Sequence, residues 1–116
     1  MTLQEIVNQL GFQVRAGAGR LSAPVGGGYA SDLLSDVMAH ARPKDLWITL
    51  QTHQNIVAVV LVKELAGIVV VNGREPDEDT VAKAEEEGVP LMTSGMSTFE
   101  LAGRLHGMGL IPSKKL

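Results

Sequence analysis

The fold is decided by residues 46–76, which read LWITLQTHQNIVAVVLVKELAGIVVVNGREP. This stretch predicts a strand over residues 46–50, a polar loop, an apolar helix over 56–65 and a second strand over 68–71. The second strand is apolar and β-branched throughout, which is typical of a central parallel strand covered on both faces. A strand, a helix and another strand in this order predict a parallel pair joined by a crossover.

The same rhythm continues downstream of this stretch. A helix is expected over residues 77–87, with Asp77 as a plain cap, then a strand over 91–93. A last helix is expected to begin at Ser97 or Thr98 and to end at His106. Repeated strand and helix units indicate an α/β fold, a three-layer sandwich with a largely parallel sheet.

The residues upstream are expected to complete that sheet with shorter elements. Thr2 and Glu5 form a capping-box pattern that opens a first helix, and a half-buried strand follows around Phe12 and Val14. A second helix is expected after the cap Ser31-Asp32, with an apolar face formed by residues 33, 34, 37, 38 and 41. We expect one domain over residues 1–110 and a frayed tail over 111–116.

Composition excludes several classes of function. The chain has 116 residues, a net charge of −3 and 3% aromatic residues, a balance that argues against nucleic acid as a partner. The N-terminus does not resemble a signal peptide, and no apolar run approaches the roughly 20 residues of a membrane span. We therefore expect a cytoplasmic protein. The absence of cysteine excludes disulfides, thiolate catalysis and cysteine ligation of zinc or iron-sulfur clusters.

Three polar loops follow the three predicted parallel strands, over residues 51–55, 72–76 and 93–97. Ligands bind outside the carboxyl ends of parallel strands, where helix N-termini favour an anionic group. We expect Thr52, His53 and Asn55 to hydrogen-bond a ligand. The remaining contacts are expected from side chains that orient the ligand or receive its anionic part, namely Asn72, Arg74, Ser94 and Ser97.

Each of these features also has a structural interpretation. Ser97 and Asn55 stand where ordinary helix caps stand. His53 is the one histidine placed for general-base work, but it has no partner residue in the sequence. The glycines at 17 and 19 and at Gly27 and Gly28 match neither the P-loop nor the dinucleotide pattern, so we interpret them as structural turns. No catalytic constellation, metal-ligand spacing or cofactor motif is present, and the acidic runs are interpreted as solvated helix faces.

The segments GGYASDLLSDVM (residues 27–38), QTHQN (51–55), VNGREP (71–76) and STFELA (97–102) together resemble the DRTGG domain family. The resemblance covers about residues 3–109. It implies an α/β fold similar to the N-terminal domains of HPr kinase and of Mur ligases such as MurF, used as a regulatory or dimer-forming module without catalysis. The sequence departs from the family pattern near Ser22-Ala23, where the Asp-Arg pair would fall, and at Gly26, where a threonine is expected.

The resulting expectation is a non-catalytic regulatory or ligand-sensing homodimer that binds a nucleotide or another phosphate-bearing anion at the strand-end loops. The alternative is a protein-assembly module or an accessory subunit of a larger system, because some small stand-alone relatives are labelled hydrogenase-associated. An exposed apolar face on the helix over residues 56–65 would favour the alternative.

Overall fold

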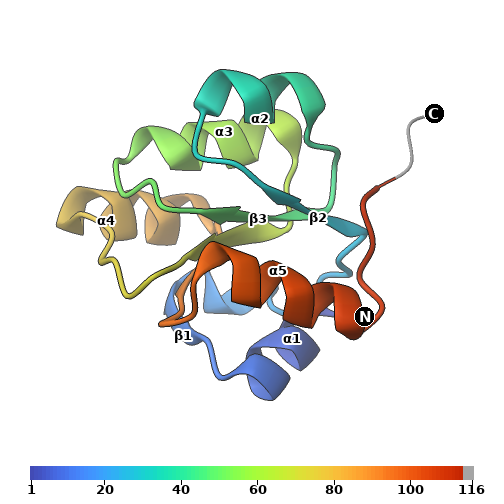
Figure 1. Cartoon of the computed structure of the whole chain (residues 1–116). Helices are drawn as coiled ribbons and strands as arrows, with labels where there is room; N and C mark the ends of the chain where they lie inside the picture. The colour runs from blue at the N-terminus through green and yellow to red at the C-terminus, as the bar shows by residue number, and fades with distance from the viewer. Residues whose placement is uncertain (114–116) are drawn as a thin grey trace.

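In the computed structural model, which describes residues 1–113, five strands form one sheet in the order β1-β5-β4-β3-β2 (Figure 1). The elements are, in chain order, α1 (Leu3–Leu10), β1 (Gln13–Ala16), the 3-10 helix η1 (Ala18–Arg20), β2 (Gly27–Ala30), α2 (Leu34–His40), β3 (Asp45–Thr49), α3 (Asn55–Lys63), β4 (Gly67–Val70), α4 (Glu78–Glu87), β5 (Leu91–Thr93) and α5 (Thr98–Gly107).

Four of the strands are parallel, which confirms the predicted largely parallel sheet. β2 pairs with β3, β3 with β4 and β4 with β5 in parallel register. β1 pairs antiparallel with β5 and forms one edge, and β2 forms the other. The consecutive strands β3, β4 and β5 therefore lie side by side, and their carboxyl ends share one edge of the sheet.

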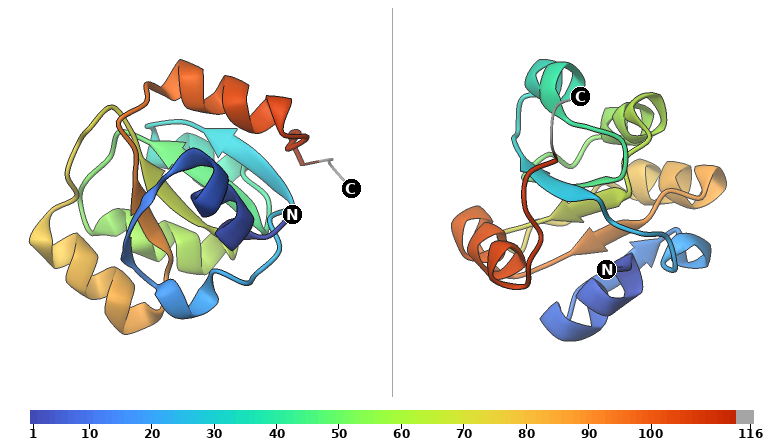
Figure 2. Two further views of the ribbon diagram at one scale, coloured as in Figure 1. Left: turned by 90° about the horizontal axis from the view of Figure 1, so that it is seen from below. Right: turned by 90° about the vertical axis from the view of Figure 1, so that its right-hand side faces the viewer.

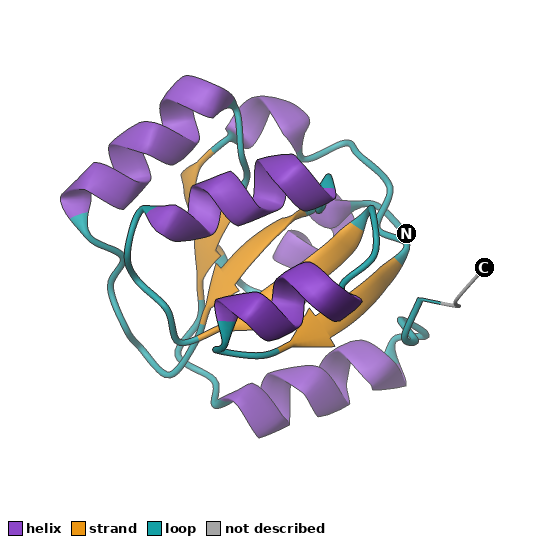
Figure 3. Ribbon diagram, turned by 90° about the horizontal axis from the view of Figure 1, so that it is seen from above, coloured by secondary structure: helices purple, strands orange, loops and turns teal. Residues whose placement is uncertain are grey.

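Helices cover both faces of the sheet. α2, α3 and α4 lie on one face, and α1 and α5 on the other (Figures 2 and 3). Along β4, Ile68 and Val70 pack toward the first helical layer, whereas Val69 packs toward the second. Because both faces are buried, every residue of this strand is apolar or glycine. The predicted three-layer sandwich is confirmed.

The helices on the α1 and α5 face begin as the sequence predicts. Thr2 Oγ1 accepts a hydrogen bond from the Glu5 backbone N–H at 3.2 Å, and Gly11 ends α1 in the left-handed conformation. Ser97 Oγ accepts from the Glu100 N–H at 3.2 Å and caps α5. Asp77 occupies the N-cap position of α4 but makes no side-chain cap bond, so the predicted cap is wrong in that respect.

The prediction that Ser31 and Asp32 cap α2 is wrong. The helix starts at Leu34, and its N-cap residue, Leu33, has no side-chain cap bond and is 64% exposed. Asp32 Oδ1 instead accepts from the Leu50 N–H at 2.7 Å and from the Thr49 hydroxyl at 3.2 Å. The carboxylate thus fastens the end of β3 to the end of β2, because these parallel strands finish side by side.

Gly27 and Gly28 are not turn residues, contrary to the prediction. They begin strand β2 and pair with Asp45 and Leu46 of β3. The physical reason for glycine here is the C-terminal segment, which crosses the strand. A Cβ on Gly27 would lie 2.4 Å from Ser113 Oγ, and that hydroxyl donates a hydrogen bond to the buried Asp45 carboxylate. The rest of the predicted frayed tail, residues 114–116, lies outside the described residues.

The structural interpretation of the first glycine pair is confirmed for Gly17 alone. Its φ is +74°, and a Cβ at this position would lie 2.3 Å from the backbone carbon and oxygen of Val89. Gly19 has open space around its Cβ position and no positive φ. The loop after β1 therefore packs directly onto the backbone that leads into β5, and it can do so because residue 17 has no side chain.

The two glycines give a matched test of this packing. Gly17→Ala should lower the free energy of unfolding by about 3 kcal/mol, since it adds backbone strain to overpacking against a rigid neighbour. Gly19→Ala should change it by less than about 0.5 kcal/mol. Urea denaturation of both variants measures the difference, and equal stabilities would contradict the close approach.

Candidate functional site

The three polar loops predicted from the sequence meet at one edge of the sheet, as expected from the parallel order of β3, β4 and β5. Backbone hydrogen bonds join them. The Asn72 N–H donates to the Met96 carbonyl at 2.7 Å, and the Gly73 N–H donates to the Ser94 carbonyl at 3.1 Å. The Thr52 carbonyl accepts from the N–H of Asp77, the residue directly after the second loop, at 3.1 Å. The loops thus form one continuous, internally bonded surface.

Arg74 stands in the middle of this surface and borders two hollows. The first, which we call the Asp32 hollow, has a volume of about 230 Å³ and is lined by Asp32, Leu50, Gln51, Thr52 and Arg74. The second, which we call the Gly95 hollow, has a volume of about 270 Å³ and is lined by Gly11, Gln13, Gly73, Arg74, Glu75, Thr93, Ser94 and Gly95.

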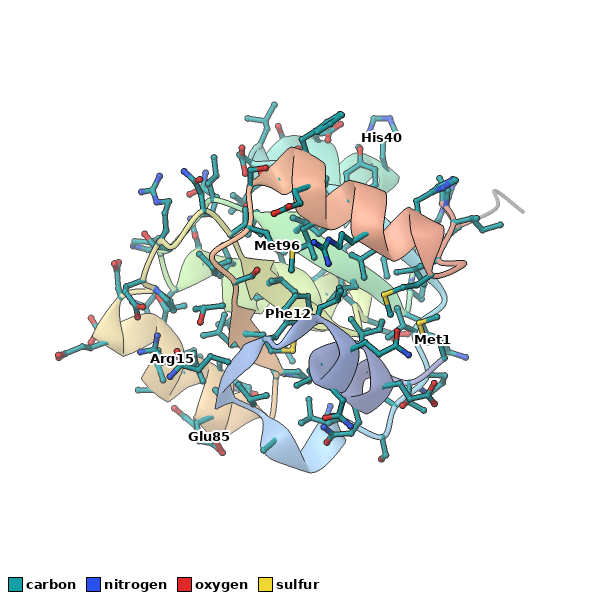
Figure 4. All side chains as sticks on the ribbon, turned by 60° about the horizontal axis from the view of Figure 1, so that its bottom comes forward. Met1, Phe12, Arg15, His40, Glu85 and Met96 are labelled. Atoms are coloured by element: carbon teal, nitrogen blue, oxygen red, sulfur yellow. The ribbon has the colours of Figure 1, made fainter. Side chains whose placement is uncertain are left out.

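The guanidinium of Arg74 is exposed and forms no ion pair with any residue in 1–113. The neighbouring Glu75 is different, because its carboxylate pairs with Arg15 on the edge strand β1. Figure 4 shows Arg15 close to α4. This pairing offsets the negative charge of Glu75, so Arg74 supplies a positive charge between the hollows that attracts an anion.

Of the seven predicted ligand residues, Thr52, Arg74 and Ser94 line the hollows. The structure places the other four at the same edge but outside both linings. These are His53, Asn55, Asn72 and Ser97.

Local backbone structure accounts for these four positions. His53 Nδ1 accepts from the Asn55 N–H at 3.1 Å, and Asn55 is the first residue of α3 and not its N-cap, which is Gln54. The capping interpretation is therefore confirmed for Ser97 and wrong for Asn55. Asn72 has a φ of +62° and is followed by Gly73 at +69°, the pattern of a tight turn closed by the hydrogen bond from the Arg74 N–H to the Val71 carbonyl. Asparagine tolerates this conformation better than most residues.

Asp32 and Gln51 are two of the lining residues that the sequence did not predict. Both line the Asp32 hollow, and Gln51 Nε2 donates to the Asp32 carbonyl at 2.7 Å. A signal was available, because Asp32 comes two residues after a strand that runs parallel to β3. The glycines at the start of that strand hid it, and Asp32 was therefore interpreted as a helix cap.

Another hollow, of about 290 Å³, lies at the opposite end of the sheet, beside Lys44, Ala66 and Pro90, which precede the strands β3, β4 and β5. Its lining is mostly apolar side chains and backbone, with Arg20 and Glu64 at its border. None of the three polar loops reaches it. Polar side chains of three neighbouring loops converge at the carboxyl edge, where ligands bind in open parallel sheets, and we therefore place the candidate site there.

A second polar cluster lies between β2 and α2. The Tyr29 hydroxyl donates to Asp36 Oδ2 at 2.8 Å, and His40 Nδ1 lies 3.0 Å from Asp36 Oδ1. The hydrogen bond from Tyr29 lowers the pKa of the Asp36 carboxyl, and His40 acts in the same direction. The same hydrogen bond raises the pKa of the Tyr29 hydroxyl. This cluster fastens α2 to the edge strand.

Among residues 1–113, no group of three or more His, Asp or Glu side chains is placed to hold a metal ion. No helix in this range has the length and apolar character needed to span a bilayer.

Fold and site together define a class: a small open-sheet α/β domain with a polar surface at the carboxyl ends of its parallel strands. The family model of the DRTGG domain matches residues 5–108. The chain therefore belongs to the DRTGG domain family. No curated protein sequence matches it significantly.

A solved structure shares the fold. It is the crystal structure of the CBS and DRTGG domains of the regulatory region of Clostridium perfringens pyrophosphatase, complexed with its activator diadenosine tetraphosphate. The TM-score is 0.71 at 18% sequence identity, and the match covers 95% of this chain and 47% of the other. The present chain thus spans about half the length of the solved one.

The left-handed turn at Asn72 gives one prediction about the site. Asn72→Gly should leave the free energy of unfolding within about 0.5 kcal/mol of the wild type, whereas Asn72→Ala should lower it by about 1 kcal/mol. Urea denaturation of the two variants measures the difference. If alanine is as stable as asparagine, the residue is not selected for its backbone conformation.

The Asp36 cluster gives a prediction about acid stability. Because its pKa is lower in the folded state, Asp36 stabilises the protein above the unfolded carboxyl pKa of about 4, and this contribution is lost as the pH falls through the folded value. The Tm of the wild type should therefore fall more steeply below about pH 4 than that of Asp36→Asn. Asp79→Asn, on the exposed surface of α4, serves as the control. Parallel curves for wild type and Asp36→Asn would refute the linkage.

Proposed function

We propose that this protein is a non-catalytic regulatory module that senses a nucleotide or another small phosphate-bearing anion at the strand-end loops. The observation that carries the proposal is Arg74, an exposed guanidinium without an ion-pair partner in residues 1–113, between two polar hollows at the carboxyl edge of the sheet. One guanidinium can bind two oxygens of the same phosphate. The N-termini of the crossover helices also lie at this edge of the sheet, and they favour an anion.

The structural relative supports a regulatory role. The solved region with the same fold is regulatory, and its complex contains a nucleotide activator. That region holds CBS domains beside its DRTGG domain, and the present chain covers 47% of it. Regulation by a phosphate-bearing ligand is therefore our proposal for this chain, argued from its own strand-end surface.

The predicted residues take different roles in this proposal. Arg74 neutralises the anion, and the Thr52 and Ser94 hydroxyls bind the ligand from the two hollows. His53 contributes through Nε2, because its Nδ1 accepts from the backbone of α3. Asn72 holds the turn that presents Arg74, and Ser97 fixes the N-terminus of α5, which faces the anionic part of the ligand.

The second candidate function is protein assembly, and a specific observation favours it. On α3, Leu61 is 42% exposed and Val62 is 66% exposed, and the neighbouring α2 exposes 39% of Met38. Exposed apolar side chains on neighbouring outer helices are a feature of association surfaces. We propose that this face forms the homodimer or receives a protein partner, as in an accessory subunit of a larger enzyme system such as a hydrogenase-associated one.

A thermal-shift titration tests ligand sensing. The purified protein is titrated with adenine and guanine nucleotides, inorganic phosphate, pyrophosphate and acetyl phosphate, with sedimentation of the same sample. A ligand that binds only the folded state raises the Tm with concentration. Arg74→Ala should weaken binding roughly tenfold or more in low salt, and the effect should shrink as salt is added.

Arg104→Ala is the matched control, because Arg104 is an exposed arginine on α5 that pairs with Glu100. It should bind as the wild type does. A Tm that none of the anions changes would overturn the sensing proposal, and a stable dimer in the same sample would then favour the assembly function. Equal affinities of Arg74→Ala and wild type would place the anion elsewhere.

A further inference from the structure

The Asp32 hollow carries two opposite charges that do not pair with each other. Asp32 and Arg74 both line it, yet no ion pair of 4 Å or less joins them. The Asp32 carboxylate and the Arg74 guanidinium can therefore bind two different groups of one ligand.

The Asp32 carboxylate is held in place with one oxygen to spare. Its Oδ1 accepts from the Leu50 N–H at 2.7 Å and from the Thr49 hydroxyl at 3.2 Å. Its other oxygen, Oδ2, has no hydrogen-bond partner in residues 1–113. The side chain is thus oriented without being saturated.

The backbone around Asp32 is also fixed. Gln51 Nε2 donates to the Asp32 carbonyl at 2.7 Å, and the buried indole of Trp47 donates to the Ser31 carbonyl at 2.8 Å. Ordering these groups costs nothing further when a ligand binds, because the fold has already ordered them. This is the arrangement expected of a recognition site held ready before the ligand arrives.

We propose that Asp32 binds the adjacent hydroxyl groups of a ribose, so that the ligand of the proposed site is a nucleotide or another ribose phosphate. This inference rests on the proposed function. An ionised carboxylate accepts hydrogen bonds only, and neighbouring sugar hydroxyls supply two donors in suitable positions. Arg74 binds the first phosphate, which lies between the two hollows.

The Gly95 hollow has room for the phosphates that follow. Gly73 and Gly95 line it without side chains, Ser94 contributes a hydroxyl, and the Glu75 carboxylate is paired with Arg15. A free amino acid could also bind Asp32 through its ammonium group and Arg74 through its carboxylate. Its two charged groups would occupy the Asp32 hollow alone and leave the Gly95 hollow without a function, whereas a ribose with a phosphate chain uses both.

The test compares ATP, 2′,3′-dideoxy-ATP and inorganic pyrophosphate on the full chain, with affinities from calorimetry. The wild type should bind ATP on the order of tenfold more tightly than the dideoxy analogue, the usual effect of hydrogen bonds to a charged group. Asp32→Asn should bring this ratio near one without weakening pyrophosphate binding, because it removes a negative charge from the hollow that Arg74 also lines. Asparagine keeps the oxygen that accepts from Leu50, and retained pyrophosphate binding verifies the fold.

Two comparisons separate the inference from the function on which it rests. Arg74→Ala should weaken all three ligands, and Asp79→Asn should alter none. If the wild type binds pyrophosphate and ATP but does not distinguish ATP from its dideoxy analogue, the ribose assignment is wrong and anion sensing stands. A preference that Asp32→Asn retains would also overturn the assignment. If the wild type binds none of the three ligands, both proposals fail. Ribose 5-phosphate in the same assay shows whether the base is needed.

Discussion

Burial of β3 and β4 on both faces is the constraint on which the rest of the structure depends. A strand covered by helices on each side must satisfy its backbone within the sheet, and parallel neighbours joined by crossover helices accomplish this. The carboxyl ends of three consecutive strands are thereby brought to one edge. Arg74 follows the most deeply buried of these strands, and its central position at the site is a consequence of the sheet order.

The sequence predicts those helices and strands whose conformation follows from their own hydrophobic pattern. Residues 46–50 and 68–71 are apolar except for Thr49, so their burial and parallel pairing could be expected without coordinates. β2 was missed because Gly27 carries no strand preference. Its extended conformation depends on pairing with Asp45 and on the crossing of Ser113, contacts that lie far away in the sequence. The antiparallel pairing of β1 with β5 is a tertiary property of the same kind.

The candidate site could likewise be predicted in part, in its location but not in its side-chain contacts. Its edge could be predicted, because strand order and loop polarity are properties of the pattern. The state of each side chain could not, because polar residues in short loops first satisfy the backbone around them. His53 is engaged by α3 and Asn72 by its turn, so the groups left for a ligand are fewer than the polar residues present. Asp32 likewise binds the backbone of Leu50 instead of capping α2, and it therefore lines the site.

The hydrogen bond from Trp47 to the Ser31 carbonyl has a spectroscopic consequence. Trp47 is the one tryptophan in the chain, it is fully buried, and its indole touches the backbone immediately before Asp32. Tryptophan fluorescence of the unmodified protein therefore originates from one side chain, which is hydrogen-bonded to the residue that precedes Asp32. Separation of β2 from β3 would admit water to the indole and shift its emission to the red. The protein thus carries its own optical reporter of whether the sheet edge beside Asp32 is closed.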